Sequence, residues 1–139
     1  MPEDYPERLE AGTIATPCIL GLGAGVTYVE KHFDKIQQKI EAVSKYAFNR
    51  LEELSNIIIY TKYNNAKNGV IAFNVKNMQS TTVADILNQN KICVRSGLHC
   101  APLKHRSLGT LENGCVRISF SHFNNMGEVD KMIEVLKTI

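Results

Sequence analysis

The chain has 139 residues, a length typical of one domain or of one lobe of a larger protein. Its hydrophobic share of 44% and charged share of 22% are ordinary for globular proteins and exclude collagen-like, low-complexity and disordered classes. The 16 basic and 14 acidic side chains nearly cancel and are intermixed, so charge predicts neither a nucleic-acid nor a membrane partner.

The cellular location and the redox state of the cysteines are predicted from features that the sequence lacks. No apolar stretch approaches the roughly 20 residues of a transmembrane helix, and the first residues have no apolar signal core. We therefore expect a cytoplasmic protein. Its four cysteines, Cys18, Cys93, Cys100 and Cys115, are expected to be reduced, because a chain of this length needs no disulfides to fold.

The first 20 residues are expected to form an arm. Pro2, Pro6 and Pro17 exclude a regular helix across this segment, and its apolar residues show no sustained period. Such a segment cannot pack alone, so we expect it to lie on another domain or subunit. The predicted division is an arm over residues 1–20 and a small domain over residues 21–139.

Helix is predicted over residues 22–54, either as one long helix or as two helices with a break near Asp34. The apolar residues there recur every three or four positions: Val29, Phe33, Ile36, Ile40, Val43, Ala47, Leu51 and Leu54. The glycines at 21, 23 and 25 resemble a phosphate-binding loop, but no strand precedes them and no Lys-Ser or Lys-Thr pair follows. The pattern favours small residues where a helix packs closely.

Strands and two further helices are predicted in the remainder. Short apolar runs over 57–60, 69–75, 92–95 and 115–121 predict four strands. Residues 80–89 predict a short helix, and Asn125 with Glu128 predicts a capping pair that opens a last helix. This order predicts an α/β sandwich with helices against a small sheet.

The last predicted strand presents an arginine away from its apolar face. Val116 and Ile118 alternate with Arg117 and Ser119, so Arg117 points opposite to the apolar side chains. A guanidinium on rigid backbone suits a carboxylate ligand held by two parallel hydrogen bonds. The pattern equally allows an arginine that pairs with a core acid or is solvated.

The loop at residues 95–105 carries the most unusual chemistry. Cys100 follows His99 in a segment containing Gly and Pro, after a predicted strand that ends in Arg95, a setting that favours an exposed, reactive thiolate. The sequence alone leaves open a nucleophile or an ordinary loop cysteine. A zinc site formed by Cys93, His99, Cys100 and Cys115 is disfavoured, because there is no Cys-x-x-Cys pair and Cys93 and Cys115 are expected to be buried.

Three histidines have no expected role in a site. His32 lies on the long predicted helix and His122 follows the last predicted strand, where surface or capping roles are typical. His105 follows a lysine, and the sequence names no partner for it.

The segment Arg-Ser-Gly-Leu-His-Cys-Ala-Pro at residues 95–102 resembles the active-cysteine loop of SufS-type (group II) cysteine desulfurases, enzymes with the class-V aminotransferase fold. Further segments resemble that family in the same order: residues 8–13, Thr16-Pro17, and residues 21–25, 69–74 and 116–124. The resemblance covers essentially the whole chain. It implies a small, mainly antiparallel sheet with helices packed on it, as in the small C-terminal domain of fold-type I pyridoxal-phosphate enzymes.

The resemblance implies a chemistry and a set of roles. Such enzymes use pyridoxal phosphate to move sulfur from L-cysteine to a loop cysteine as a persulfide, with release of alanine. By likeness Cys100 takes the sulfur, Arg117 holds the substrate carboxylate, and Arg95 and His99 shape the site. Thr13 would reach the cofactor phosphate in a partner subunit of a homodimer. The persulfide would pass to an acceptor protein, for example in iron–sulfur cluster assembly.

The chain also departs from the family. It resembles only the C-terminal third, without the cofactor-carrying lysine or the large domain that binds most of the cofactor. We therefore expect a fragment, a truncated product or half of a split enzyme, inactive alone. Ile14-Ala15 also departs from the usual residues after Gly-Thr, which weakens the expected contact of Thr13. The alternatives are a stand-alone persulfide carrier or partner-binding module without cofactor chemistry, and a structural remnant.

Overall fold

The computed structural model describes residues 3–9 and 12–139 of the chain. Pro2 and positions 10 and 11 of the motif at residues 8–13 lie outside the described residues. The chain divides into two units, Met1–Asp34 and Lys35–Ile139, and each is treated by itself. Among the described residues, no helix is both long and apolar enough to cross a membrane.

The first unit contains the short 3-10 helix η1 (Glu7–Leu9) and the beginning of α1 (Thr16–Glu52). α1 begins at Thr16, six residues before the predicted start at residue 22. Pro17 does not prevent this, because it lies in the first turn of the helix, where a missing N–H costs nothing. The three glycines at 21, 23 and 25 lie inside this helix, so they form no phosphate loop. The predicted arm over residues 1–20 and its docking on another domain or subunit stay predictions.

The apolar stripe of α1 is buried only in the second unit. Val43, Ala47 and Leu51 are almost inaccessible, whereas Val29 and Phe33 of the first unit are 46% and 55% exposed. The helix is continuous through Asp34, so of the two alternatives the structure has one long helix and no break there. Helical periodicity therefore identified the helix but not how much of its apolar face is covered by the described residues.

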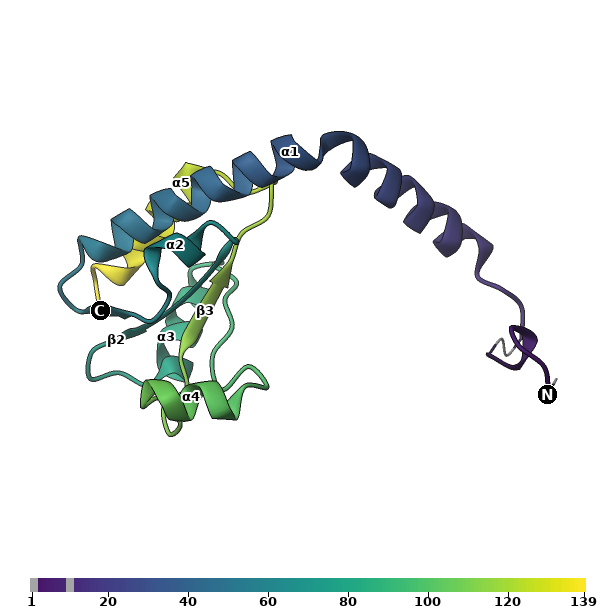
Figure 1. Ribbon diagram of the computed structural model, residues 1–139. Helices are drawn as coiled ribbons and strands as arrows, with labels where there is room; N and C mark the ends of the chain where they lie inside the picture. The colour runs from purple at the N-terminus through teal and green to yellow at the C-terminus, as the bar shows by residue number, and fades with distance from the viewer. Residues whose placement is uncertain (1–2, 10–11) are drawn as a thin grey trace. The chain divides into compact units, whose positions relative to one another are not determined.

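The second unit is built on an antiparallel sheet of three strands, β1 (Ile57–Ile59), β2 (Val70–Val75) and β3 (Val116–Ser119). The strand order is β1-β2-β3, with Ile59 opposite Phe73 and Ala72 opposite Arg117. This confirms the predicted mixed α/β class and small antiparallel sheet. Figure 1 shows β3 beside β2 in this unit.

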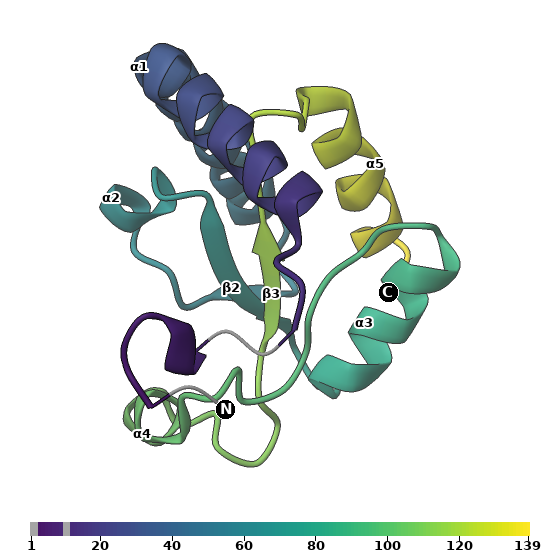
Figure 2. The ribbon, with the colours of Figure 1, turned by 90° about the vertical axis from the view of Figure 1, so that its right-hand side faces the viewer.

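One layer of helices covers one face of the sheet. The C-terminal part of α1, which contains its buried residues, packs with α3 (Ser80–Gln89) and α5 (Met126–Leu136) on this face. All three helices bury apolar side chains against β2 and β3. Figure 2 shows α3 and α5 on the same side of these strands. The core on this face contains Val43, Leu51, Ile71, Phe73, Val83, Leu87, Val116, Ile133 and Leu136.

Two helices were predicted correctly from local signals. α3 has the bounds expected from the sequence, 80–89. α5 begins with a complete capping box, in which the Asn125 side chain accepts from the Glu128 N–H and the Glu128 carboxylate accepts from the Asn125 N–H. These contacts satisfy two N–H groups that the first turn of a helix otherwise leaves open.

The predicted strand over residues 92–95 is wrong. Only Arg95 pairs with β3, as an isolated bridge to Arg117, and the residues before it make no ladder. Two short helices were not predicted: α2 (Tyr63–Ala66) and α4 (Pro102–Leu108). α4 carries Pro102 at its start and ends at Gly109 in left-handed conformation (φ 69°), which are ordinary start and stop signals. The sequence predicted a loop over this segment.

Candidate functional site

The loop that carries Cys100 is pinned along the edge of β3. Arg95 and Arg117 exchange two backbone hydrogen bonds, of 3.0 and 2.7 Å between N and O. Gly97 and Cys115 exchange two more, each 3.1 Å. Two residue pairs therefore fix the start of the loop, and Cys100 follows directly after them.

Two glycines permit this close approach. Gly97 and Gly114 both have positive φ, 98° and 60°, which side-chain-bearing residues rarely adopt. A Cβ atom added to Gly114 would lie 2.6 Å from the Cα of Gly97. A side chain at Gly114 would therefore displace the loop, whereas at Gly97 the space is open and a side chain would strain the backbone through its positive φ.

Cys100 itself is exposed and lies in an unusual backbone conformation. His99 and Cys100 both have left-handed φ values, 51° and 58°, although neither is glycine. Such residues cost of order 1–3 kcal/mol each and cluster at functional sites. The thiol is thus presented to solvent on a loop whose base is fixed, as a nucleophile requires. Its role as nucleophile stays a prediction.

His99 lies inward of Cys100 and keeps a free lone pair. Its Nε2 lies 3.0 Å from the carbonyl oxygen of Cys115, and a carbonyl only accepts, so Nε2 carries the proton. Its Nδ1 is buried without a hydrogen-bond partner. Burial lowers the pKa of His99, and the positive charges of Arg117 and Arg95 act in the same direction, so the imidazole is neutral near pH 7.

Arg117 is half-buried on the sheet face opposite the core, as the strand alternation predicted. Its Nε is buried and makes no hydrogen bond, and among the described residues no carboxylate lies within ion-pair distance of its guanidinium. Of the sequence alternatives, pairing with a core acid therefore finds no support. The guanidinium is therefore placed to bind an external anion, to which its N–H groups would donate.

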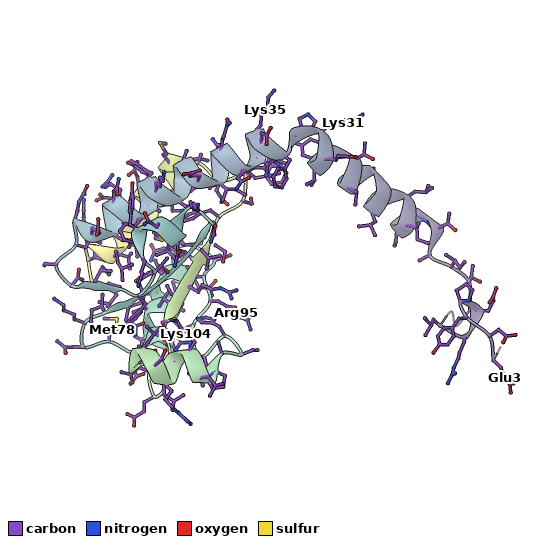
Figure 3. The ribbon with its side chains drawn as sticks, viewed as in Figure 1. Glu3, Lys31, Lys35, Met78, Arg95 and Lys104 are labelled. Carbon is purple, nitrogen blue, oxygen red and sulfur yellow. The ribbon has the colours of Figure 1, made fainter. Side chains whose placement is uncertain are left out.

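The predicted residues are only partly brought together. Arg95, Arg117 and His99 lie in one neighbourhood, since both guanidiniums act on the His99 ring. Figure 3 shows Arg95 beside β3 and Lys104 on α4. Cys100 extends outward and does not line the cavity on this side of the sheet. Thr13, between η1 and α1, is exposed and belongs to the first unit.

A cavity of about 590 Å³ lies beside this loop. Its walls come from the end of β1, from β2, from α2 and from α4, and include Tyr60, Thr61, Lys62, Asn65, Ala72, His99, Lys104, His105 and Cys115. No Asp or Glu lines it, and Lys62 and Lys104 are both solvent-exposed. Pyridoxal phosphate needs a Schiff-base lysine and a partner for its ring nitrogen. The described residues therefore do not form a complete site for this cofactor.

Sequence reasoning missed one group of residues beside this cavity. His105 is buried, and its Nδ1 lies 2.8 Å from the Thr110 hydroxyl oxygen. His99, His105 and Cys115 each bring a potential ligand atom within 4.8 Å of the other two. Cys115 is buried as predicted, whereas Cys93 is exposed, contrary to prediction. One sequence signal could have pointed to His105. Pro102, which lies three residues after His99, is a typical first residue of a helix, and such a helix contains His105.

Comparison with known proteins matches this chain to one family. The model of the family described as aminotransferase class-V matches residues 2–132. The "Probable cysteine desulfurase" of Pyrococcus abyssi is 40% identical over 136 residues, which are 96% of this chain and 33% of the relative. The "Cysteine desulfurase" of Haloferax volcanii is 31% identical over 96% of this chain and 31% of the relative.

Solved structures give the same match. A cysteine desulfurase from Thermococcus onnurineus superposes with a TM-score of 0.83 at 37% identity, over 96% of this chain and 33% of that one. The cysteine desulfurase CsdA from Escherichia coli superposes with a TM-score of 0.81 at 20% identity, over 98% of this chain and 33% of that one, a likeness of fold alone. This chain spans about a third of the length of the curated relatives it matches.

Proposed function

The chain belongs to the class-V aminotransferase family, and from that membership we propose that it is the sulfur-accepting domain of a SufS-type (group II) cysteine desulfurase dependent on pyridoxal phosphate. The observation that carries the proposal is the exposed Cys100 on a loop pinned to β3, with Arg95 and Arg117 at its base. Sulfur moves from L-cysteine to the Cys100 thiol. The products are a Cys100 persulfide and alanine, and no external oxidant or reductant is needed.

The roles of the neighbouring side chains follow from their chemistry. The Arg117 guanidinium, whose Nε has no partner within the described chain, binds the substrate carboxylate. Arg95, which pairs with Arg117 through two backbone hydrogen bonds, adds positive charge that favours binding of the carboxylate. His99, neutral and held by the Cys115 carbonyl, shapes the inner wall of the loop.

The cofactor is held mainly outside these residues. Pyridoxal phosphate, when bound, supplies the electron sink that loosens the bond between the cysteine β-carbon and its sulfur. The cavity described above supplies neither the carboxylate partner nor a buried lysine. We therefore assign the cofactor to the large domain found in the longer relatives, with Thr13 reaching its phosphate across a homodimer interface. L-cysteine, a sulfur-acceptor protein, a cytoplasmic location and a role in iron–sulfur cluster assembly belong to the same proposal.

A hybrid enzyme tests this proposal. The chain replaces the segment of the Pyrococcus abyssi relative that it matches, and alanine and sulfide are assayed with L-cysteine and added pyridoxal phosphate. We expect alanine release that is lost in Cys100→Ser and kept in Cys93→Ser, a change at another exposed cysteine. Full alanine release in Cys100→Ser contradicts the proposal. Circular dichroism and gel filtration establish that each hybrid is folded.

A stand-alone persulfide carrier is the second candidate. The observation in its favour is that the exposed Cys100 lies beside a cavity without a cofactor partner among its lining residues. A carrier accepts sulfur from a separate desulfurase and L-cysteine without the missing domain. If the isolated chain gains no persulfide in that mixture, or if Cys100→Ser gains as much as the unchanged chain, the carrier function is excluded.

A further inference from the structure

We propose that His99, His105 and Cys115 form a binding site for a zinc-class transition metal ion. One ligand atom from each side chain lies within 4.8 Å of the other two. Two imidazoles and one thiolate are a donor set that zinc prefers. This site is separate from the sulfur-accepting role of Cys100, whose thiol is not among the clustered atoms.

Each histidine is already oriented as a ligand. The Nε2–H of His99 donates to the Cys115 carbonyl, which leaves Nδ1 with a lone pair and no partner. The Thr110 hydroxyl lies 3.5 Å from the His105 carbonyl, to which it donates, so it accepts from Nδ1–H of His105 and leaves Nε2 with the lone pair. Metal-binding histidines typically donate their second ring N–H to a carbonyl or a similar group in this way.

Without a metal ion, one atom of the cluster, Nδ1 of His99, is buried and has no hydrogen-bond partner. A Cys115 thiol carries one proton and can satisfy at most one of the two imidazole lone pairs. A buried lone pair without a partner costs roughly 1–3 kcal/mol. A metal ion satisfies both lone pairs and the sulfur together, and Cys115 releases its proton when it binds.

The geometry requires a small closure. Tetrahedral zinc with Zn–N bonds of about 2.0–2.1 Å and a Zn–S bond of about 2.3 Å places its ligand atoms roughly 3.3–3.6 Å apart. From separations of at most 4.8 Å, the ligand atoms must therefore approach one another by no more than about 1.5 Å. His99 lies in the loop and His105 on the short α4, and neither side chain belongs to the apolar core.

Three protein ligands leave one coordination position open. His99, His105 and Cys115 all line the cavity of about 590 Å³, so this position faces a space that a water molecule or a thiol can enter. The positive charges of Arg95 and Arg117 near His99 disfavour a hard cation without an anionic ligand. The Cys115 thiolate supplies that charge, which selects a thiophilic ion over Mg²⁺ or Ca²⁺.

The experiment is a titration of the reduced 139-residue chain with Co²⁺, a spectroscopic probe for zinc sites, followed by displacement with Zn²⁺. We expect one ion per chain, with a thiolate-to-cobalt charge-transfer band in the unchanged chain, in Cys93→Ser and in Cys100→Ser. Cys115→Ser should lose the band. Thr110→Val keeps all three ligands and should weaken binding by about 10–100-fold.

Several results overturn the site. They are no saturable binding, a charge-transfer band that survives Cys115→Ser, and a band that requires Cys93 or Cys100, which would mean capture by exposed thiols. Because Cys115→Ser alters a buried position, His99→Ala provides a second test at a half-buried one. If His99→Ala is folded by circular dichroism and binds Co²⁺ as tightly as the unchanged chain, the proposal fails.

Discussion

The two faces of the small sheet differ in what they leave unsatisfied. The face toward α1, α3 and α5 is apolar and closed, with Ile71, Phe73 and Val116 fully buried. The opposite face carries polar groups. Within the described part of the chain, four buried side-chain atoms lack a hydrogen-bond partner, and three of these, on Asn74, His99 and Arg117, lie on or beside it.

This difference separates stability from function in one domain. Apolar burial on the first face contributes about 25 cal/mol per Å² and needs no further partner. Unpaired buried polar groups on the second face cost free energy until something binds them. The second face is therefore the one for which we propose ligands: a carboxylate at Arg117 and a metal ion at the histidine pair.

The largest stability effect is expected on the closed face. Phe73→Ala removes a fully buried ring and should lower the free energy of unfolding by about 3–5 kcal/mol. Val70→Ala on the same strand, at a position 41% exposed, should cost less than about 1 kcal/mol. Urea unfolding monitored by circular dichroism measures both. Equal losses would show that the closed face does not carry the stability.

A substitution on the second face of the sheet, which carries Arg117, should change the activity and leave the stability nearly unchanged. In the hybrid enzyme, Arg117→Lys should lower kcat/KM for L-cysteine by about ten- to a hundredfold, because a charge-assisted hydrogen bond contributes about 1.5–3 kcal/mol and lysine cannot bind a carboxylate bidentately. Steady-state kinetics of alanine release measures it. Arg106→Lys, at an exposed position on α4, is the matched control. A loss of similar size in both variants would contradict the assignment of Arg117.

A smaller effect is expected at the start of α5, whose apolar side lies on the closed face. Asn125→Ala removes the capping bond to the Glu128 N–H and should cost about 0.5–2 kcal/mol in urea unfolding. Asn88→Ala, at an exposed position within α3, should be neutral or slightly stabilising, because alanine favours helix. An unchanged midpoint for Asn125→Ala would show that the cap does not stabilise this layer.

The smallest effect should depend on pH. Hydrogen bonds from the Asn124 side chain and the Asn125 N–H lower the pKa of Glu128 from its ordinary value of 4.5. The stabilisation is thus complete above that value and is lost as the pH falls through the lowered pKa of the folded chain. Glu128→Gln should be less stable than the unchanged chain at pH 7, and the difference should shrink in acid. Urea midpoints across pH measure it, and a constant difference would contradict the ionised cap.

The sequence predicted those parts of the fold that depend on neighbours along the chain. Both α3 and α5 carry their apolar period within about ten residues, and α5 also carries its capping residues, so both were predicted correctly. The strand over residues 92–95 was wrong because pairing depends on distant β3, which in that segment bonds Arg95 alone through the isolated bridge to Arg117. Cys93 is exposed for the same reason, since no strand covers that edge among the described residues.

The candidate site was predictable only in part. The orientation of Arg117 follows from strand alternation, and the exposure of Cys100 from its Gly- and Pro-containing loop. The approach of His99, His105 and Cys115 depends on the contact between Gly97 and Gly114 and on the turn of α4. No fixed spacing of metal ligands encodes these features, so a search for Cys-x-x-Cys pairs could not find the cluster.

The central claim, that Cys100 is the sulfur acceptor, is tested most directly by locating the sulfur. The hybrid enzyme is incubated with L-cysteine, its persulfides are trapped by an alkylating agent, and each cysteine-containing peptide is analysed by mass spectrometry. We predict one additional sulfur atom on the peptide that contains Cys100, formed together with alanine, and none on the peptides of Cys18, Cys93 or Cys115. Alanine release with the sulfur on another cysteine, or on none, would contradict the account.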